Sequence, residues 1–93
     1  MTSERASVKE ILRLLEIEDP SILESLRREG LFPEDTVGPD TADELRVALT
    51  WVRDLGVNPA GVEVALRLRR RVLVLQQLTE RSLRRLLSEL EGR

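Results

Sequence analysis

Apolar residues recur every three or four positions in four segments of this 93-residue chain. Such spacing places side chains on one face of a helix. The first three segments hold the sets Val8, Ile11, Leu12 and Leu15; Ile22, Leu23 and Leu26; and Leu45, Ala48, Leu49, Val52 and Leu55. The fourth segment runs from Val62 to Leu90. The pattern therefore predicts a mainly α fold built from four helices.

The predicted helix starts carry two kinds of capping signal. Ser7–Glu10 and Thr41–Glu44 match the capping box, in which the hydroxyl and the carboxylate each accept a hydrogen bond from the other residue's backbone amide. Asp19-Pro20 and Asn58-Pro59 each place a capping side chain before a proline, whose missing N–H leaves no donor unpaired. Two glycines are expected at the C-terminal ends of helices: Gly30 and Gly56.

The first two predicted helices are separated only by the turn Glu16–Glu18, which is typical of a helix-turn-helix. The next segment, Leu31–Asp40, contains prolines and a glycine and has no helical period. It is therefore a loop or a small two-stranded hairpin. Its only candidate strand residues are Leu31-Phe32 and Thr36-Val37.

The last helical segment extends from Asn58-Pro59 to roughly Glu91, about 50 Å at 1.5 Å per residue, which is too long to lie on so small a body. A wide apolar surface on an overhanging helix favours a second chain, so we predict a homodimer. The expected dimer-interface residues are Ala65, Leu68, Val72, Leu75, Leu86 and Leu90. The alternative is one amphipathic helix folded back on the body. The weakly apolar stretch 79–82 would allow a kink or break.

The composition removes most enzyme chemistry. The chain has no Cys, His or Tyr, and so lacks the usual neutral-pH general base and the commonest metal ligand. Its five glycines are scattered at turns, which excludes a glycine-rich phosphate loop, and Glu34-Asp35 is only a weak cation site. We therefore expect no enzyme activity, cofactor or metal. Short uncharged runs and the absence of an apolar signal segment predict a cytoplasmic protein without a membrane span.

The net charge of −2 conceals an asymmetry along the chain. Residues 1–58 carry thirteen acidic and seven basic side chains, a net charge of −6. Residues 59–93 carry eight arginines and four glutamates, a net charge of +4. A split of this kind usually marks two surfaces with different partners.

The acidic half contains the predicted helix-turn-helix. When such a motif reads DNA, the exposed face of its second helix enters the major groove with basic or amide side chains. Here the expected exposed positions are Ser21, Glu24, Ser25, Arg28 and Glu29, preceded by Glu16, Glu18 and Asp19. Residues 31–44 contain no basic side chain at all. DNA phosphates would repel such a face.

Arginines cluster in the last helix, at Arg67, Arg69, Arg70 and Arg71 and again at Arg81, Arg84 and Arg85. Four arginines in five positions spread over more than half of the helix circumference, so they cannot all face one groove. We interpret them as solvated flanks of the dimer seam. Phosphate or RNA contact is the alternative, but the only aromatic residues are Phe32 and Trp51, which we expect to pack internally.

The stretch Asp54–Glu63, Asp-Leu-Gly-Val-Asn-Pro-Ala-Gly-Val-Glu, resembles a segment of the MerR-like winged-helix superfamily. The capped first helix and the second helix ending Arg-Arg-Glu-Gly-Leu-Phe add to a resemblance that covers about residues 7–78. It implies a MerR-like winged helix-turn-helix domain with a minimal wing over residues 1–57. A long C-terminal dimerisation helix follows over residues 58–93.

Two branches of that superfamily share the stretch, the heat-shock repressor family HspR and the chaperone-modulator family CbpM. HspR-like repressors place a His-Pro, an aromatic residue and several arginines in the recognition helix. This chain has Asp19-Pro20, Leu26 and an acidic wing in those places, so it is more similar to the CbpM branch. CbpM-like proteins bind the J-domain of a DnaJ-type co-chaperone and prevent it from stimulating DnaK.

The resemblance and the charge together predict capture of a J-domain by an acidic face. The residues expected to bind it are Glu18, Asp19, Ile22, Glu24, Ser25 and Arg28. The alternative function is a MerR/HspR-like DNA-binding transcriptional regulator of chaperone genes. A third option is a subunit of some other assembly that uses the long helix for a different partner. We expect a homodimer that binds no nucleic acid.

Overall fold

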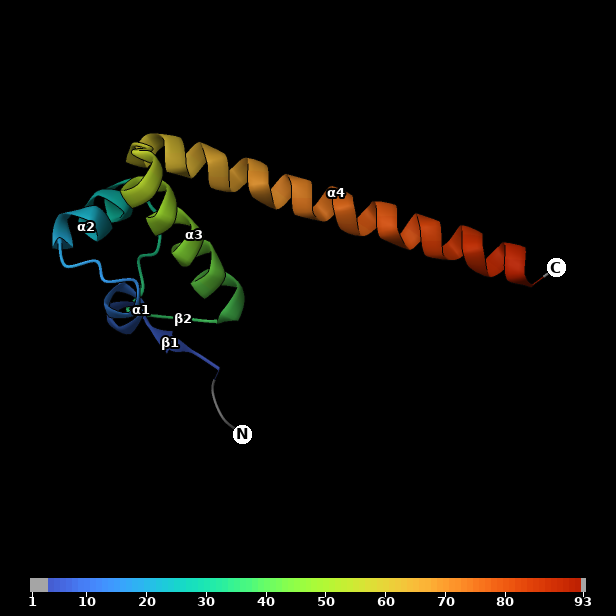
Figure 1. Ribbon diagram of the computed structural model, residues 1–93, viewed down its shortest axis with the longest axis horizontal. Helices are drawn as coiled ribbons and strands as arrows, with labels where there is room; N and C mark the ends of the chain where they lie inside the picture. The colour runs from blue at the N-terminus through green and yellow to red at the C-terminus, as the bar shows by residue number, and fades with distance from the viewer. Residues whose placement is uncertain (1–3, 93) are drawn as a thin grey trace.

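Three helices and a short pair of strands form the body of the molecule, and a fourth helix projects from it (Figure 1). This computed structural model describes residues 4–92. In chain order the elements are β1 (Ala6–Ser7), α1 (Val8–Leu14), α2 (Pro20–Arg28), β2 (Thr36–Val37), α3 (Pro39–Leu55) and α4 (Pro59–Glu91). The predicted mainly α class is confirmed, with a helix in each of the four predicted segments.

The core of the body draws side chains from all four helices and from the segment that ends in β2. Its buried apolar residues are Val8, Leu26, Leu31, Phe32, Val37, Leu45, Ala48, Leu49, Val62 and Leu66. The apolar faces predicted for the first three helices lie in this core or pack against it, with one exception. Leu55 is 70% exposed because it is the last residue of α3, where Gly56 turns the chain away.

Two of the four predicted helix starts are confirmed in atomic detail. The Asp19 carboxylate accepts a hydrogen bond from the Ser21 amide at 2.9 Å, and the Asn58 side chain accepts one from Gly61 at 2.7 Å. In both cases the proline occupies the first turn of the helix. A short polar side chain followed by proline is thus sufficient to start α2 and α4.

The two predicted capping boxes are wrong. Ser7 does precede α1, but its side chain makes no capping bond. Ser7 is instead a residue of β1, and the amide of the next residue, Val8, donates to the Asp35 carbonyl at 2.9 Å. Helix α3 starts at Pro39, after Gly38, so Thr41 lies inside its first turn rather than at its cap. Pro39 can open the helix because the first turn needs no N–H from it.

Helices α1, α2 and α3 are each followed by a left-handed residue. Gly30 has a φ of 82° and Gly56 a φ of 66°, as expected of glycines that follow helices. Helix α1 ends in the same way on a non-glycine residue, Glu16, with a φ of 58°. There the Ile17 amide donates to the Leu12 carbonyl at 2.9 Å, which completes the turn toward α2.

The strand pair differs from the predicted hairpin. Thr36-Val37 forms β2, but its antiparallel partner is β1, with Ala6 opposite Val37 and Ser7 opposite Thr36. Leu31 and Phe32 are buried in the core instead of pairing as a strand. Two large apolar side chains next to the end of α2 gain more from burial than from a solvent-exposed ladder.

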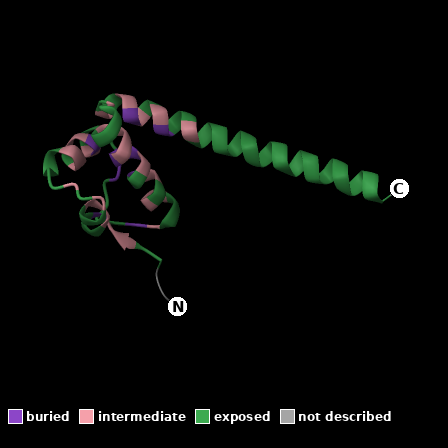
Figure 2. Ribbon diagram, viewed as in Figure 1, coloured by how far each residue is buried: buried purple, intermediate pink, exposed green. Residues whose placement is uncertain are grey.

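Helix α4 is continuous from Pro59 to Glu91, so the weakly apolar stretch 79–82, which would allow a break, does not interrupt it. Only Val62 and Leu66 of this helix are buried, and every residue from Arg70 to Gly92 is exposed (Figure 2). The alternative in which the helix folds back on the body is therefore wrong. The molecule measures 59 × 36 × 21 Å because of this projecting arm. Among the described residues, no helix is long and apolar enough to cross a membrane.

Candidate partner-binding surfaces

The predicted J-domain-binding residues lie on the α1–α2 turn and along α2. Glu18, Asp19, Glu24 and Arg28 are exposed, as predicted. Ser25 is half-buried, and its hydroxyl accepts a hydrogen bond from Arg28 at 3.4 Å. Ile22 is also half-buried and packs against the core, so it supports the face more than it extends from it.

Asp19 is both a helix cap and a surface charge. Hydrogen bonds from the backbone and then the side chain of Ser21 lower the pKa of its carboxyl group. The carboxylate therefore stays ionised at neutral pH and remains exposed.

Arg27 is turned away from this face. Its Nε donates to the Phe32 carbonyl at 2.8 Å and its Nη2 to the Glu34 carbonyl at 3.1 Å, and it lies 3.4 Å from the Asp35 carboxylate. These contacts could not be predicted from the sequence, because they depend on how the 31–35 segment wraps around the end of α2. As a result, Arg28 is the basic residue that α2 leaves on its outer face.

The face has a basic border that the sequence analysis missed. A shallow hollow beside the α1–α2 turn is lined by Lys9 and Arg13 of α1 as well as by Glu16, Glu18 and Asp19. Lys9 and Arg13 are four residues apart and therefore lie on one side of α1. That spacing was visible in the sequence, but the packing angle that brings it next to the acidic turn was not.

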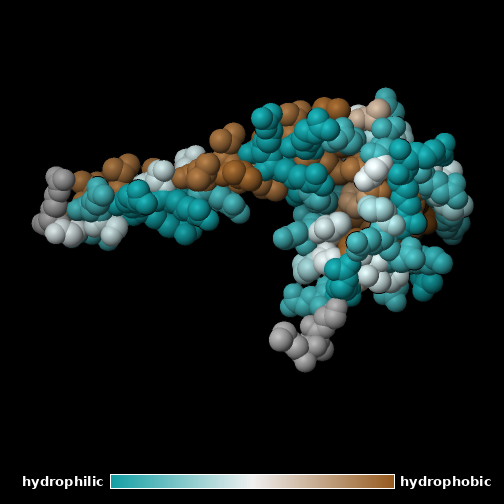
Figure 3. Space-filling model, turned by 180° about the vertical axis from the view of Figure 1, so that it is seen from behind, coloured by the Kyte–Doolittle hydropathy of each residue, from teal (hydrophilic) through white to brown (hydrophobic). Residues whose placement is uncertain are grey.

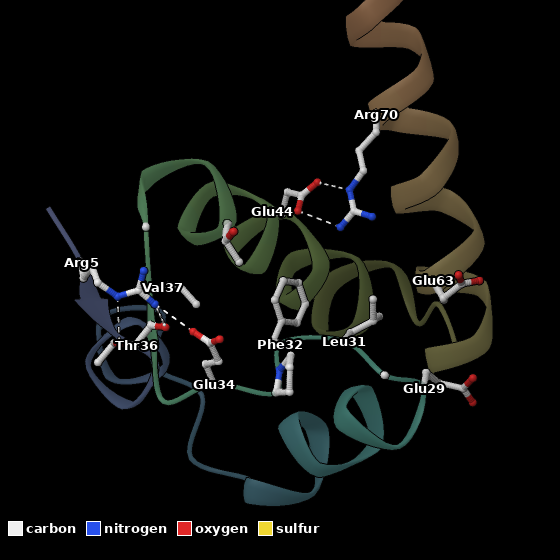
Figure 4. A pocket seen from close by; sticks show the side chains of 14 residues that line it. Arg5, Glu29, Leu31, Phe32, Glu34, Thr36, Val37, Glu44, Glu63 and Arg70 are labelled. Carbon is white, nitrogen blue, oxygen red and sulfur yellow. Dashed lines mark hydrogen bonds and ion pairs between the residues drawn. The ribbon is translucent and has the colours of Figure 1, made fainter.

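A second acidic hollow, of about 490 Å³, lies between the end of α2, the 31–38 segment and the start of α3 (Figure 4). Its fourth side is the part of α4 that lies next to the body, which we call the root of α4. Four glutamates line it: Glu29, Glu34, Glu44 and Glu63. Three of these are paired, with Arg5 at 3.0 Å from Glu34, Arg70 at 2.5 Å from Glu44, and Arg67 close to Glu63. The hollow is thus largely neutralised by arginines of the same chain.

Two of the four arginines in the first cluster, Arg69 and Arg70, hold α4 against α3. Arg70 makes a two-point pair with Glu44, and Arg69 lies 3.0 Å from Asp43. The pairing with Glu44 raises the pKa of Arg70, and hydrogen bonds from Arg46 and then Arg69 lower the pKa of Asp43. Arg71 makes no ion pair with the described residues. Arg69 and Arg70, which we expected to be solvated, are therefore paired with acids of α3 instead.

The projecting part of α4 carries most of the predicted dimer-interface residues. Leu68, Val72, Leu75, Leu86 and Leu90 are 52% to 63% exposed. Ala65 lies at the root and is half-buried. Helix α4 also exposes apolar residues outside that prediction: Val64, Leu73, Val74, Leu78, Leu83 and Leu87. Figure 3 shows apolar side chains gathered along one edge of the arm and polar ones along the other.

Exposure of this extent is unusual in a soluble monomer, where large contiguous apolar patches mark interaction sites. Within residues 4–92, no group of three or more His, Cys, Asp or Glu side chains could hold a metal ion.

No known family model matches this chain, and no curated protein or solved structure is significantly similar to it.

Proposed function

We propose that this protein is a chaperone modulator that binds the J-domain of a DnaJ-type co-chaperone and blocks its stimulation of DnaK. The observation that carries the proposal is the charge of the outer α1–α2 face. Glu18, Asp19 and Glu24 are exposed there, while Arg27 is held by the 31–35 segment. On the α2 side of the face, Arg28 is then left against these three acids, and the basic residues Lys9 and Arg13 of α1 lie only at its border.

This charge favours a basic protein as the partner. J-domains present a basic helix to DnaK, and an acidic face could compete for that helix. Complementary charge accelerates encounter and disfavours partners of the wrong sign. Because the charges are exposed, salt should weaken the interaction, since the Debye length is only about 8 Å at 0.15 M ionic strength.

The geometry of α2 supports a docking role for this face. The Asp19 cap and the left-handed Gly30 define both ends of the helix, and Leu26 anchors it in the core. A helix fixed in this way presents Glu24 without a large entropic cost on binding. The mechanism is occlusion: a J-domain helix held against α2 cannot contact DnaK.

The second part of the proposal is that the protein is a homodimer through α4. Its apolar arm is exposed over more than twenty residues in a chain otherwise rich in charge. Burial of that arm against a second copy would remove the apolar surface from water. Each dimer would then carry two J-domain-binding faces.

A DnaK ATPase assay tests this function. DnaK is stimulated by a J-domain protein encoded in the same genome, and the modulator is titrated in at low salt. We expect the stimulated rate to fall to the basal rate, the basal rate to be unchanged, and inhibition to weaken as salt is raised. A stimulated rate that stays unchanged at a large excess of modulator overturns the proposal.

The second candidate function is a MerR/HspR-like DNA-binding regulator. One observation favours it: Arg81, Arg84 and Arg85 are all exposed on the arm. These side chains would have to offset the acidic body to hold DNA. A gel-shift assay on the promoters of chaperone genes distinguishes the two functions, because the chaperone-modulator proposal predicts no shifted band.

A further inference from the structure

The exposed arm of α4 carries a regular apolar stripe. Its members are Leu68, Val72, Leu75, Thr79, Leu83, Leu86 and Leu90. The six leucine and valine side chains are each at least 52% exposed. At about 100° per residue, all seven positions fall on one narrow face of the helix.

The spacing of this stripe repeats every eleven residues. Successive members are 4, 3, 4, 4, 3 and 4 positions apart, so Leu68, Thr79 and Leu90 are separated by eleven residues each. A seven-residue repeat continued from Leu75 would place Ser82 and Glu89 in the seam instead of Leu83 and Leu90. Eleven residues in three turns is slightly more than the natural period of a helix, so paired helices would wind around each other in a shallow right-handed supercoil.

The same spacing is symmetric about Thr79. Reading from Thr79 toward either end of α4 gives members at distances of 4, 7 and 11 residues. Two copies running in opposite directions therefore place Val72 opposite Leu86 of the second copy, with Thr79 opposite itself. We propose that a second copy of this chain covers the arm, and that the two α4 helices are antiparallel and centred on Thr79.

Charges at the edge of the stripe favour this orientation. Arg71 and Glu89 are eighteen residues apart, which is about five turns, so they lie on the same edge. In the antiparallel pair, Arg71 comes within about two residues of Glu89 of the second copy, and the contact occurs twice. On the other edge of the stripe, Leu73 comes within about two residues of Leu87 of the second copy. Arg71 has no ion pair with the described residues of its own chain.

A parallel pair would lack this complementarity. In a parallel pair, each edge of the stripe would lie against the other edge of the second copy. Arg71 would then lie near Arg69 and Gln76 of the second copy, and Glu89 near its Glu91. Like charges would then face one another at both ends of the seam.

Thr79 suits the centre of an apolar seam. Its hydroxyl already donates to the Leu75 carbonyl at 3.0 Å, so the polar group is satisfied within the helix. Its methyl group can therefore face the second copy without leaving a donor unpaired. This inference refines the proposed self-association and does not depend on capture of a J-domain.

The absence of cysteine in the native chain allows a direct test by disulfide cross-linking. Thr79→Cys, Val72→Cys, Leu86→Cys and Arg84→Cys are prepared in the full chain, and helix content is compared by circular dichroism. We expect Thr79→Cys to form a covalent dimer, and Val72→Cys to cross-link with Leu86→Cys when the two are mixed. Val72→Cys alone and the off-stripe control Arg84→Cys should remain uncrosslinked.

Other cross-linking patterns overturn the inference. Cross-linking of Val72→Cys and of Leu86→Cys each with itself would show a parallel pair. Failure of both Thr79→Cys and the mixture, together with a mass of 10.6 kDa in sedimentation, would show that no second copy covers the stripe. A cross-link of Arg84→Cys as strong as that of Thr79→Cys would show that the contact is non-specific.

A charge swap tests the orientation without cysteine. Arg71→Glu should weaken dimerisation by about tenfold because it places like charges together at both contacts. The double variant Arg71→Glu, Glu89→Arg should restore most of that affinity, measured by sedimentation. A double variant as weak as the single one contradicts the antiparallel register.

Discussion

Arg70 of α4 and Glu44 of α3 form a two-point ion pair across 26 positions of sequence, with N–O distances of 2.5 and 2.9 Å. The pair lies where α4 leaves the body (Figure 4). The pair of Arg69 with Asp43 joins the same two helices. Below it, Val62 and Leu66 are buried, and beyond it every residue of α4 is exposed. These two ion pairs therefore fix the direction in which the arm projects.

Removal of the Arg70 guanidinium should destabilise the body. The Glu44 side chain is only 15% exposed, so Arg70→Gln leaves a half-buried carboxylate without its partner. The Arg70 side chain is itself 53% exposed, which limits the expected loss of unfolding free energy to about 1 kcal/mol. Urea denaturation measures it, with Arg71→Gln as the matched control. Equal stability of the two variants would show that the ion pair contributes nothing.

Asp43 should make stability depend on pH in the acid range. Hydrogen bonds from Arg46 and Arg69 lower its pKa from the ordinary value of 3.8, so the folded state binds a proton at this site less readily than the unfolded state. Its stabilising effect is complete above the unfolded value and is lost as the pH falls through the folded one. Asp43→Asn should lower the urea midpoint at pH 7, and the difference from the native chain should shrink toward pH 3. A difference that stays constant between these pH values contradicts this assignment.

The helix caps predict a contrast between two alanine variants. Asn58→Ala removes the bond to the Gly61 amide and should reduce the unfolding free energy by about 1 kcal/mol. Ser7→Ala should reduce the unfolding free energy by only about 0.3 kcal/mol, because the Ser7 side chain makes no capping bond. Thermal unfolding of the two variants checks the contrast. A larger loss for Ser7→Ala would mean that the first capping box does form.

Glu16 offers a stabilising substitution. Its φ of 58° lies in the left-handed region, where a side chain is strained and glycine is not. Glu16→Gly should therefore raise the unfolding free energy by about 0.5 kcal/mol. Glu18→Gly, two positions later and not in that conformation, should instead lower it. Denaturation midpoints that move in the same direction for both variants would contradict the role of the backbone at Glu16.

Local signals in the sequence were sufficient for the helices but not for the tertiary contacts. Asp19-Pro20 and Asn58-Pro59 act within one turn, so their caps could be predicted. The capping bond predicted at Ser7 does not form, and Ser7 instead belongs to β1, whose pairing with β2 depends on a distant segment of the chain. Strand β1 is two residues long, and so short a strand has no alternating pattern to detect.

On the candidate surfaces, too, the exposure of single residues could be predicted, whereas contacts between distant segments could not. Exposure of Glu24 and Leu75 follows from helical periodicity, and the structure agrees with it. The withdrawal of Arg27 and the pairing of Arg69 with Asp43 do not follow from periodicity, because each depends on segments that meet only in the folded chain. Both contacts change the charge that a partner would meet.

The most direct test of J-domain capture is isothermal titration of the native chain, Glu24→Lys and Glu80→Lys with a J-domain from the same genome at low salt. Glu80 is exposed on the arm, so its reversal is a matched change of charge away from the α2 face. The proposed function predicts that the native chain and Glu80→Lys bind with similar affinity and that Glu24→Lys binds about tenfold more weakly, through loss of charge complementarity. No binding by the native chain, or equal binding by all three proteins, would contradict it.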